Sequence, residues 1–129
     1  MNKSAKQRSL ENRILKRLKG VPLEAAKLLF ADPSLQAIQE YANVVSIKRL
    51  GFNDHGPVHM RTAALNTITM FELLHDAGIE MNLEKEGVGT AEDSLTAVVL
   101  ASLLHDLGMS VTRDTHEILS IQLALPYID

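Results

Sequence analysis

Apolar residues recur at helical spacing along most of the chain. In residues 5–19, Leu10, Ile14 and Leu18 follow one another at intervals of four and form one apolar stripe, and Gly20 ends the segment. No segment alternates apolar and polar residues for long enough to predict a strand. The pattern therefore predicts an all-α fold whose first helix spans residues 5–19.

Five further helices are predicted, and Pro, Gly and capping residues mark their boundaries. The first two are residues 23–30, after Pro22, and a segment from Asp32-Pro33 to near Leu50. The third begins at Pro57, is capped by Asn53 or Asp54 and ends before Gly78. The central helix begins at a Thr90–Asp93 capping box, and the last is capped by Asp114 and is kinked or ended by Pro126. The acidic loop at residues 80–89 is too short to divide domains. We expect a single domain over residues 1–129, with N-terminal helices in 1–50 and the chemically active core in 51–129.

The central helix is almost wholly apolar and ends on a histidine and an aspartate. Residues 97–108 read AVVLASLLHDLG, and a helix that is apolar all round is predicted to be buried on most sides. An unpaired charge in such a place costs several kcal/mol or more, so the carboxylate of Asp106 needs a partner. We expect that partner to be a metal ion, with His105 and residues from elsewhere in the chain as further ligands.

Composition limits the chemistry that this site can use. The 129 residues are 46% hydrophobic and 22% charged and include no cysteine, which excludes disulfides, thiolate metal sites and cysteine nucleophiles. No apolar run approaches the roughly 18 residues of a membrane span, and the basic N-terminus lacks the apolar region of a signal peptide. We therefore expect a cytoplasmic protein without a membrane partner, whose metal ligands are His, Asp or Glu.

The charge is unevenly distributed. Residues 1–20 hold seven Lys and Arg side chains against Glu11, a net charge of +6, so the total of −3 leaves −9 for the remainder. A basic helix suits a phosphate, nucleic-acid or membrane contact, or it presents a solvated face. The lack of interleaved aromatic residues and the acidic remainder favour the solvated face and disfavour nucleic acid as a partner.

Helical geometry selects among the five histidines. Two of them precede aspartate in similar segments, LLHDAG and LLHDLG. His59 and His75 lie 16 residues apart on one predicted helix, roughly 24 Å along the axis and about 160° around it, so they cannot bind one ion. His105 belongs to another helix, which can lie beside the start of the first. The favoured site is therefore His59, His105 and Asp106, whereas His75 is favoured at its helix end by the helix dipole.

Other polar residues are weaker candidates. His116 is equally consistent with a ligand of a second metal ion and with a solvated residue at a helix start. His55 can contact a ligand or its own helix end, and Arg113 can meet a substrate anion. Arg61 lies about 200° around the helix from His59, which favours a structural ion pair that faces away from the metal.

These residues resemble a known family. The segment HMRT, which contains His59, followed by a buried helix that ends LLHDLG, resembles the HD superfamily of metal-dependent phosphohydrolases, and DHGPVHMR and DTHEILS look most like its archaeal-type members. The matching region runs from about Leu50 to Gln122. The resemblance implies an HD-domain-like helical bundle in which His59, His105 and Asp106 hold the metal, and His116 resembles the extra histidine of two-metal members. The family also uses a distal Asp; this sequence ends 23 residues after Asp106 without an equivalent, so we expect a bundle that is incomplete at its C-terminal end.

The resemblance also implies an activity. It is hydrolysis of a phosphomonoester or phosphodiester, with a small, nucleotide-like phosphorylated substrate as the favoured partner. One or two divalent ions (Mn, Fe, Mg or Ni) suit a mixed His and carboxylate set, lower the pKa of bound water and polarise the phosphoryl oxygen. Asp106 would be the catalytic residue that orients this water, and His55 and Arg113 would bind substrate. The alternative is a non-catalytic metal-binding or assembly module with an incomplete site, and a homo-oligomer is compatible with either.

Overall fold

The computed structural model describes residues 3–49, 51 and 55–128, and these residues form helices and turns without a strand. In chain order the elements are α1 (Ala5–Arg17), α2 (Val21–Ala31), α3 (Pro33–Val44), the π-helical turn η1 (Val45–Arg49), α4 (Pro57–Asp76), α5 (Asn82–Lys85), α6 (Ala91–Leu104), the 3₁₀ turn η2 (Leu107–Ser110) and α7 (His116–Ile128). The prediction of an all-α fold is confirmed. Within the described ranges, no helix combines the length and the apolar character needed to cross a membrane.

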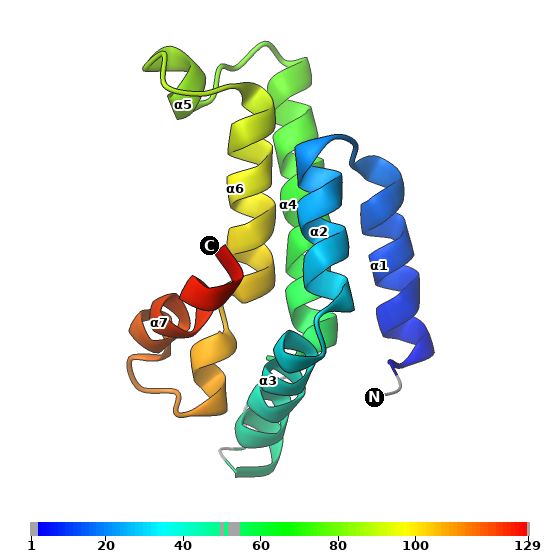
Figure 1. Ribbon diagram of the computed structural model, residues 1–129, viewed down its shortest axis with the longest axis vertical. Coiled ribbons are helices and arrows are strands. Elements are labelled where there is room, and N and C mark those ends of the chain that lie inside the picture. The colour runs from blue at the N-terminus through cyan, green and yellow to red at the C-terminus, as the bar shows by residue number, and fades with distance from the viewer. Residues whose placement is uncertain (1–2, 50, 52–54, 129) are drawn as a thin grey trace.

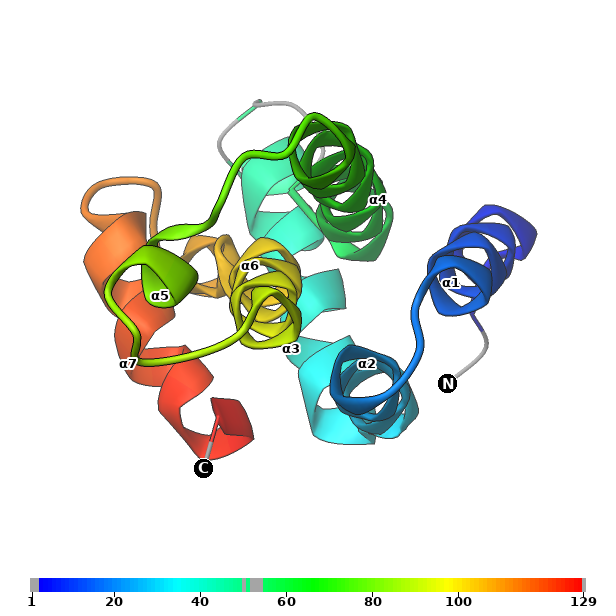
Figure 2. The same ribbon diagram turned by 90° about the horizontal axis from the view of Figure 1, so that it is seen from above.

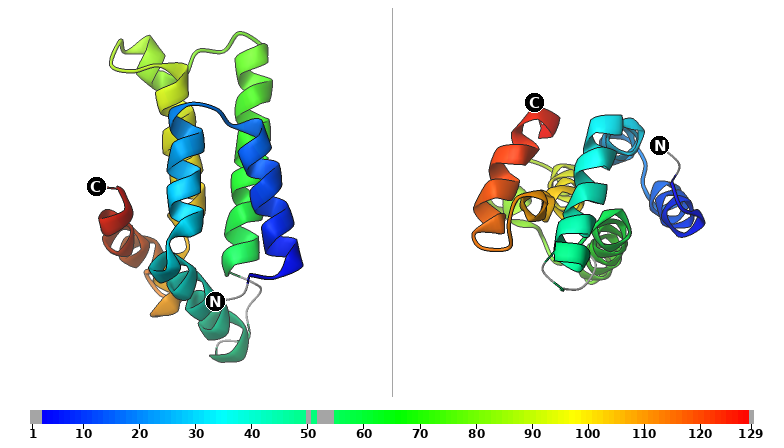
Figure 3. Two further views of the ribbon diagram at one scale, coloured as in Figure 1. Left: turned by 45° about the vertical axis from the view of Figure 1, so that its right-hand side comes forward. Right: turned by 90° about the horizontal axis from the view of Figure 1, so that it is seen from below.

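Four helices stand side by side, and their ends determine where the site lies. Helices α1, α2, α4 and α6 run roughly upright in Figure 1, with α6 packed against both α4 and α2, and α1 against α4. Helix α3 continues from the lower end of α2 and packs on η2, while α7 lies on the other side of η2 (Figures 1 and 2). Because α4 starts and α6 finishes at this lower end, the first turn of α4 meets the turn that follows α6 (Figure 3).

An aliphatic core lies between these upright helices. The stripe predicted from residues 5–19 is buried as expected, with Leu10, Ile14 and Leu18 all in the core. Met60 and Ile68 of α4 and Leu103 of α6 are also buried, so the two helices that carry the site are held by apolar packing on their inner faces.

Two predicted helix caps are present. Asp32 Oδ1 accepts hydrogen bonds from the backbone N–H groups of Ser34 and Leu35, at 2.8 and 3.2 Å. At the start of α6, Thr90 Oγ1 accepts from Asp93 N at 3.1 Å and Asp93 Oδ2 accepts from Thr90 N at 2.8 Å, which is a complete capping box.

Other predicted boundaries need correction. The helix predicted to run to near residue 50 changes to a π-helical turn at Val45–Arg49. Asn53 and Asp54 lie outside the described residues, and Gly56 occupies the N-cap position of α4. Asp114 does not begin the last helix: the carbonyl of Thr115 accepts the first backbone bonds, from Ile118 N and Leu119 N. The helix also continues through Pro126 to Ile128 instead of ending there.

The expectation that α6 is buried on most sides is wrong. Of its residues, Val99, Leu103 and Leu104 are buried, but Ala97 and Ala101 are exposed. The reason is the position of α7, which packs mainly on η2 and diverges from α6. One apolar side of α6 therefore faces an open groove.

The structural ion pair predicted for Arg61 is present in a buried polar network. Arg61 Nε donates to Glu11 Oε2 at 2.7 Å, and the same guanidinium donates to Gln39 Oε1 at 2.8 Å and to the Pro57 carbonyl at 3.1 Å. Gln39 Nε2 in turn donates to the carbonyl of Leu103 at 2.9 Å. This network ties α1 and α3 to the start of α4 and the end of α6.

Candidate metal centre

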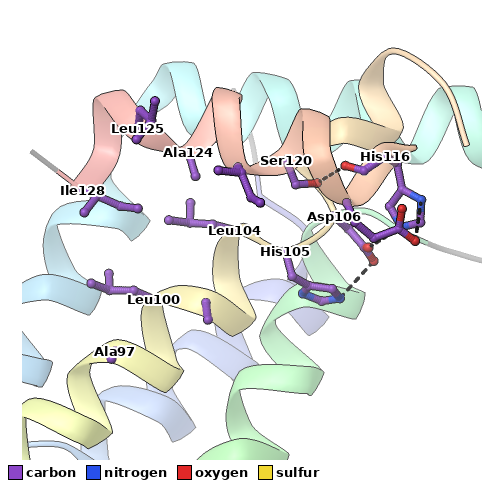
Figure 4. A pocket seen from close by; sticks show the side chains of 13 residues that line it. Ala97, Leu100, Leu104, His105, Asp106, His116, Ser120, Ala124, Leu125 and Ile128 are labelled. Carbon is purple, nitrogen blue, oxygen red and sulfur yellow. Dashed lines mark hydrogen bonds and ion pairs between the residues drawn. The ribbon is translucent and has the colours of Figure 1, made fainter. Parts of the chain in front are cut away.

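Three segments bring the candidate ligands together at the lower end of the bundle. His59 lies in the first turn of α4, and His105 and Asp106 follow directly after α6. His116 is the first residue of α7, which returns to this end because η2 and the short turn after it reverse the chain (Figure 4). The site is built from two helix starts and one helix end.

The three imidazoles surround one buried carboxylate. Asp106 Oδ2 lies 3.0 Å from His59 Nε2 and 3.1 Å from His105 Nε2, and its other oxygen, Oδ1, lies 3.4 Å from His116 Nε2. The Asp106 side chain is 5% exposed, whereas those of His59 and His105 are 37% and 42% exposed. The carboxylate is therefore enclosed, and the imidazoles of His59 and His105 form the side open to solvent.

Backbone carbonyls fix the orientation of two of these rings. His105 Nδ1 lies 2.7 Å from the Ser102 carbonyl, and His116 Nδ1 lies 2.8 Å from the Arg113 carbonyl. A carbonyl oxygen only accepts, so each Nδ1 carries a hydrogen and each neutral ring presents an Nε2 lone pair to Asp106. A lone pair facing a carboxylate oxygen needs either a proton or a cation between them. Histidines that bind metals are typically held in this way, by a hydrogen bond from the second ring nitrogen.

The donor set fits a divalent cation. One ligand atom each from His59, His105 and Asp106 lies within 4.8 Å of the others, close enough to bind a single ion. Two imidazoles and a carboxylate suit borderline to hard divalent metals, and three protein ligands leave coordination positions for water or substrate. His116 lies outside this group and faces the second oxygen of Asp106, so His116 and Asp106 are the residues that would hold a second ion.

The charges in the cluster shift the pKa values of the His-Asp pair in opposite directions. The hydrogen bond to Asp106 raises the pKa of His105 above 6.5, although burial of the ring opposes this shift. Burial alone would raise the pKa of Asp106, but the hydrogen bond from His105 and the charges of His105, His59 and His55 together bring it below 3.8. The cluster thus favours an ionised carboxylate, the form that binds metal.

These shifts predict how the stability of the metal-free protein depends on pH. Because the pKa of His105 is raised on folding, its contribution is fully present below about pH 6.5 and is lost as the pH rises through the folded-state value. We expect the urea midpoint in EDTA to be higher at pH 5.5 than at pH 8.5, and His105→Gln to reduce this difference. His75→Gln is the matched control and should preserve it; an unchanged difference in His105→Gln would refute the assignment.

The remaining sequence candidates are placed unequally. His55 lies beside the cluster: its ring centroid is 5.4 Å from that of His59, and its Nδ1 is 2.8 Å from Ser46 Oγ. Arg113 has an exposed side chain, and its carbonyl orients His116. His75 lies in the last turn of α4, where it stacks on Phe71 at the opposite end of the helix from His59. The structure therefore brings together His59, His105, Asp106 and His116 and leaves His75 out.

Sequence reasoning missed the residues that position α7. Gly108 N donates to Ser120 Oγ at 2.8 Å, and Ser120 Oγ donates to the His116 carbonyl at 2.7 Å. A Cβ at Gly108 would lie 2.0 Å from that carbonyl oxygen, so only glycine allows η2 to approach α7 this closely. The available signal was a glycine directly after the His-Asp segment and a serine four residues after His116.

Gly108→Ala should therefore disturb both the fold and the site. The added methyl group would meet backbone atoms of His116 and Ser120, which cannot rotate away, so we expect a loss of about 1–3 kcal/mol in unfolding free energy. Ser120→Ala removes the hydrogen bonds of the Ser120 hydroxyl to Gly108 N and to the His116 carbonyl without adding volume, and it should cost about 1 kcal/mol. Urea unfolding measures the free energy of unfolding of both variants. A Gly108→Ala variant as stable as wild type would refute the close approach of η2 to α7.

The comparisons with known proteins name no activity. The uncharacterized protein MJ1020 of Methanocaldococcus jannaschii is 35% identical to this chain over 122 residues. The aligned region covers 95% of the chain and 47% of MJ1020, so the chain spans about half the length of this relative. No protein-family model matches the chain. No solved structure matches it either.

Proposed function

We propose that this protein is a metal-dependent phosphohydrolase that cleaves phosphomonoesters or phosphodiesters. The observation that carries the proposal is the convergence of three imidazole Nε2 atoms on the buried carboxylate of Asp106, with two of the rings fixed through Nδ1. His59, His105 and Asp106 would hold the cation, which would lower the pKa of a bound water and polarise the phosphoryl oxygen.

The chain's own residues supply the remaining requirements. Asp106 is the buried anion of the site, and its Oδ1 is available to accept a proton from water or to bind a second cation beside His116. The His55 ring lies 5.4 Å from that of His59, centroid to centroid, where it would contact the phosphate group of a bound substrate. Arg113 has an exposed side chain three residues before His116, and its positive charge would attract an anionic substrate. The arrangement combines a site for a cation with side chains that attract an anionic substrate.

A substrate screen tests the proposal. The protein would be loaded separately with Mn²⁺, Fe²⁺, Mg²⁺ and Ni²⁺ and assayed with p-nitrophenyl phosphate, bis(p-nitrophenyl) phosphate and nucleoside phosphates. We expect hydrolysis that requires the metal and is lost on treatment with EDTA. Metal bound at the site without hydrolysis of any ester would refute the enzymatic proposal and support the non-catalytic, metal-binding alternative.

A further inference from the structure

An apolar groove runs between α6 and α7 and opens onto the candidate metal centre at His105, Asp106 and His116. Its volume is about 570 Å³, within the range of small-molecule sites. Leu100 and Leu104 line it from α6, and Ile121, Leu125 and Ile128 line it from α7. Figure 4 shows Leu100 and Leu104 of α6 and Ile128 of α7 in the space between the two helices, with His105, Asp106 and His116 at one end. The groove is therefore continuous with the candidate metal centre.

The groove is polar at one end and apolar along the rest of its length. Its polar lining residues are the three of the cluster together with Glu117 and Ser120, in the first turns of α7. The hydroxyl of Ser120 is already used by the Gly108 N–H and the His116 carbonyl. The remaining lining residues are Ala, Leu and Ile, and such side chains cannot form hydrogen bonds with the base or sugar of a nucleotide.

Exposure of this apolar lining makes the groove a candidate binding site. Ile121 is 66% exposed, Leu125 53% and Ile128 57%, and they adjoin the uncovered side of α6. Contiguous exposed apolar surface of this kind marks binding sites in soluble proteins. The polar end of the groove is lined by His105, Asp106, His116 and Glu117, and a cation held there would bind an anionic group. The complementary ligand therefore has an anionic group at one end and a hydrocarbon chain at the other.

We infer that the substrate is a phosphate monoester of an aliphatic alcohol, with its phosphate at the cluster and its hydrocarbon chain in the α6–α7 groove. This inference rests on the proposed phosphohydrolase function and specifies its substrate class. In the reaction, the water oxygen forms a new bond to phosphorus and the bond from phosphorus to the alcohol oxygen breaks. A proton from the water leaves on the alcohol, so the products are inorganic phosphate and the free alcohol. A nucleoside in the same groove would leave its polar groups without partners, which costs affinity.

Binding of phosphonates tests the inference without requiring turnover. Octylphosphonate and methylphosphonate carry the same non-hydrolysable head group and differ in the chain, and both would be titrated by calorimetry into the Mn²⁺-loaded protein below the micelle concentration. Each methylene that leaves water strengthens binding about fourfold, so burial of four gives octylphosphonate an advantage of about 250-fold. Equal affinity for the two phosphonates would overturn the inference.

Variants of α7 locate the binding site. Ile121→Asp places a charge in the groove and should remove most of the octyl advantage, and Leu125→Asp is an independent second variant. Ile118→Asp is the matched control: Ile118 is 59% exposed on the same helix but does not line the groove, so this variant should keep the advantage. An equal loss in Ile118→Asp and Ile121→Asp would show nonspecific adsorption and overturn the inference.

Rates of hydrolysis and the oligomeric state distinguish failure of this inference from failure of the proposed function. Rates would be compared for octyl phosphate, methyl phosphate and a nucleoside monophosphate, and we expect octyl phosphate to have the lowest KM. Hydrolysis without a chain-length preference would overturn the inference and leave the proposed function standing. Selective octylphosphonate binding without hydrolysis of any ester would overturn the proposed function instead. A wild-type dimer that Ile121→Asp converts to a monomer would assign the groove to a second copy of the chain and also overturn the inference.

Discussion

Asp106→Asn should abolish metal binding and phosphoesterase activity together. The substitution keeps the volume of the side chain but removes the negative charge that three imidazoles face, and the neutral amide oxygen attracts a divalent cation less strongly than a carboxylate does. Replacing a residue that merely supports a ligand costs 10–100-fold in affinity, so loss of a ligand should cost at least about 100-fold. Calorimetric titration with Mn²⁺ and a phosphoester assay measure the two effects on the same protein.

The chain supplies a matched control for this experiment in its second His-Asp pair. Asp76 follows His75 in the segment LLHDAG, but that pair lies at the opposite end of α4 from His59. Asp76→Asn should therefore leave metal affinity and activity at their wild-type values. Retention of full metal affinity by Asp106→Asn, or an equal loss in Asp76→Asn, would contradict the assigned site.

Arg61→Met should cause the largest loss of stability. Arg61 is 1% exposed, and its guanidinium pairs with Glu11, whose side chain is 10% exposed. Burial lowers the pKa of Arg61 and the charge of Glu11 opposes that shift, so the two charges are coupled. Removing Arg61 leaves the Glu11 carboxylate buried with Lys3, 2.8 Å away, as its remaining charged partner, so we expect a loss of about 3 kcal/mol, the low end for breaking a buried ion pair. Thermal unfolding should show a fall in Tm of about 10 °C or more, and urea unfolding should show a lower urea midpoint.

Two further variants identify the cause of that loss. Arg17→Met breaks an exposed ion pair with Glu72 and should cost less than about 1 kcal/mol. Glu11→Leu combined with Arg61→Met removes both buried charges and should be more stable than Arg61→Met alone. If the double variant were the less stable, the Glu11 carboxylate left without Arg61 would not be the cause. Metal affinity of folded Arg61→Met should stay near the wild-type value, since Arg61 contacts none of the candidate ligands in the described structure.

The sequence predicted most helices because their signals are local. The i, i+4 stripe of α1, the Asp32 cap and the Thr90–Asp93 capping box each depend on residues within a few positions of one another. The predicted start of α7 lies one residue too early, because Asp114 and the adjacent Thr115 are both residue types that cap helices. The backbone selects Thr115, which adopts a φ of 58°.

The candidate site was predictable to the extent that helix geometry constrains it. The distance between His59 and His75 along one helix excluded a shared site, and the structure places His105 and Asp106 beside His59. The contribution of His116 could not be decided, because its position depends on the close approach of Gly108 to α7. The position of α7 also explains why α6 is less buried than the sequence predicted. Helix α7 diverges from α6, and the groove lies between the two helices.

Metal content per chain is the most direct test of the account, whose central claim is that His59, His105 and Asp106 hold a divalent cation. Wild type and Asp106→Asn would be loaded with Mn²⁺, passed through a desalting column and measured by elemental analysis. We predict about one ion per wild-type chain, or about two if His116 holds a second, and close to none in Asp106→Asn. A wild-type chain that retains no more metal than Asp106→Asn would contradict the claim.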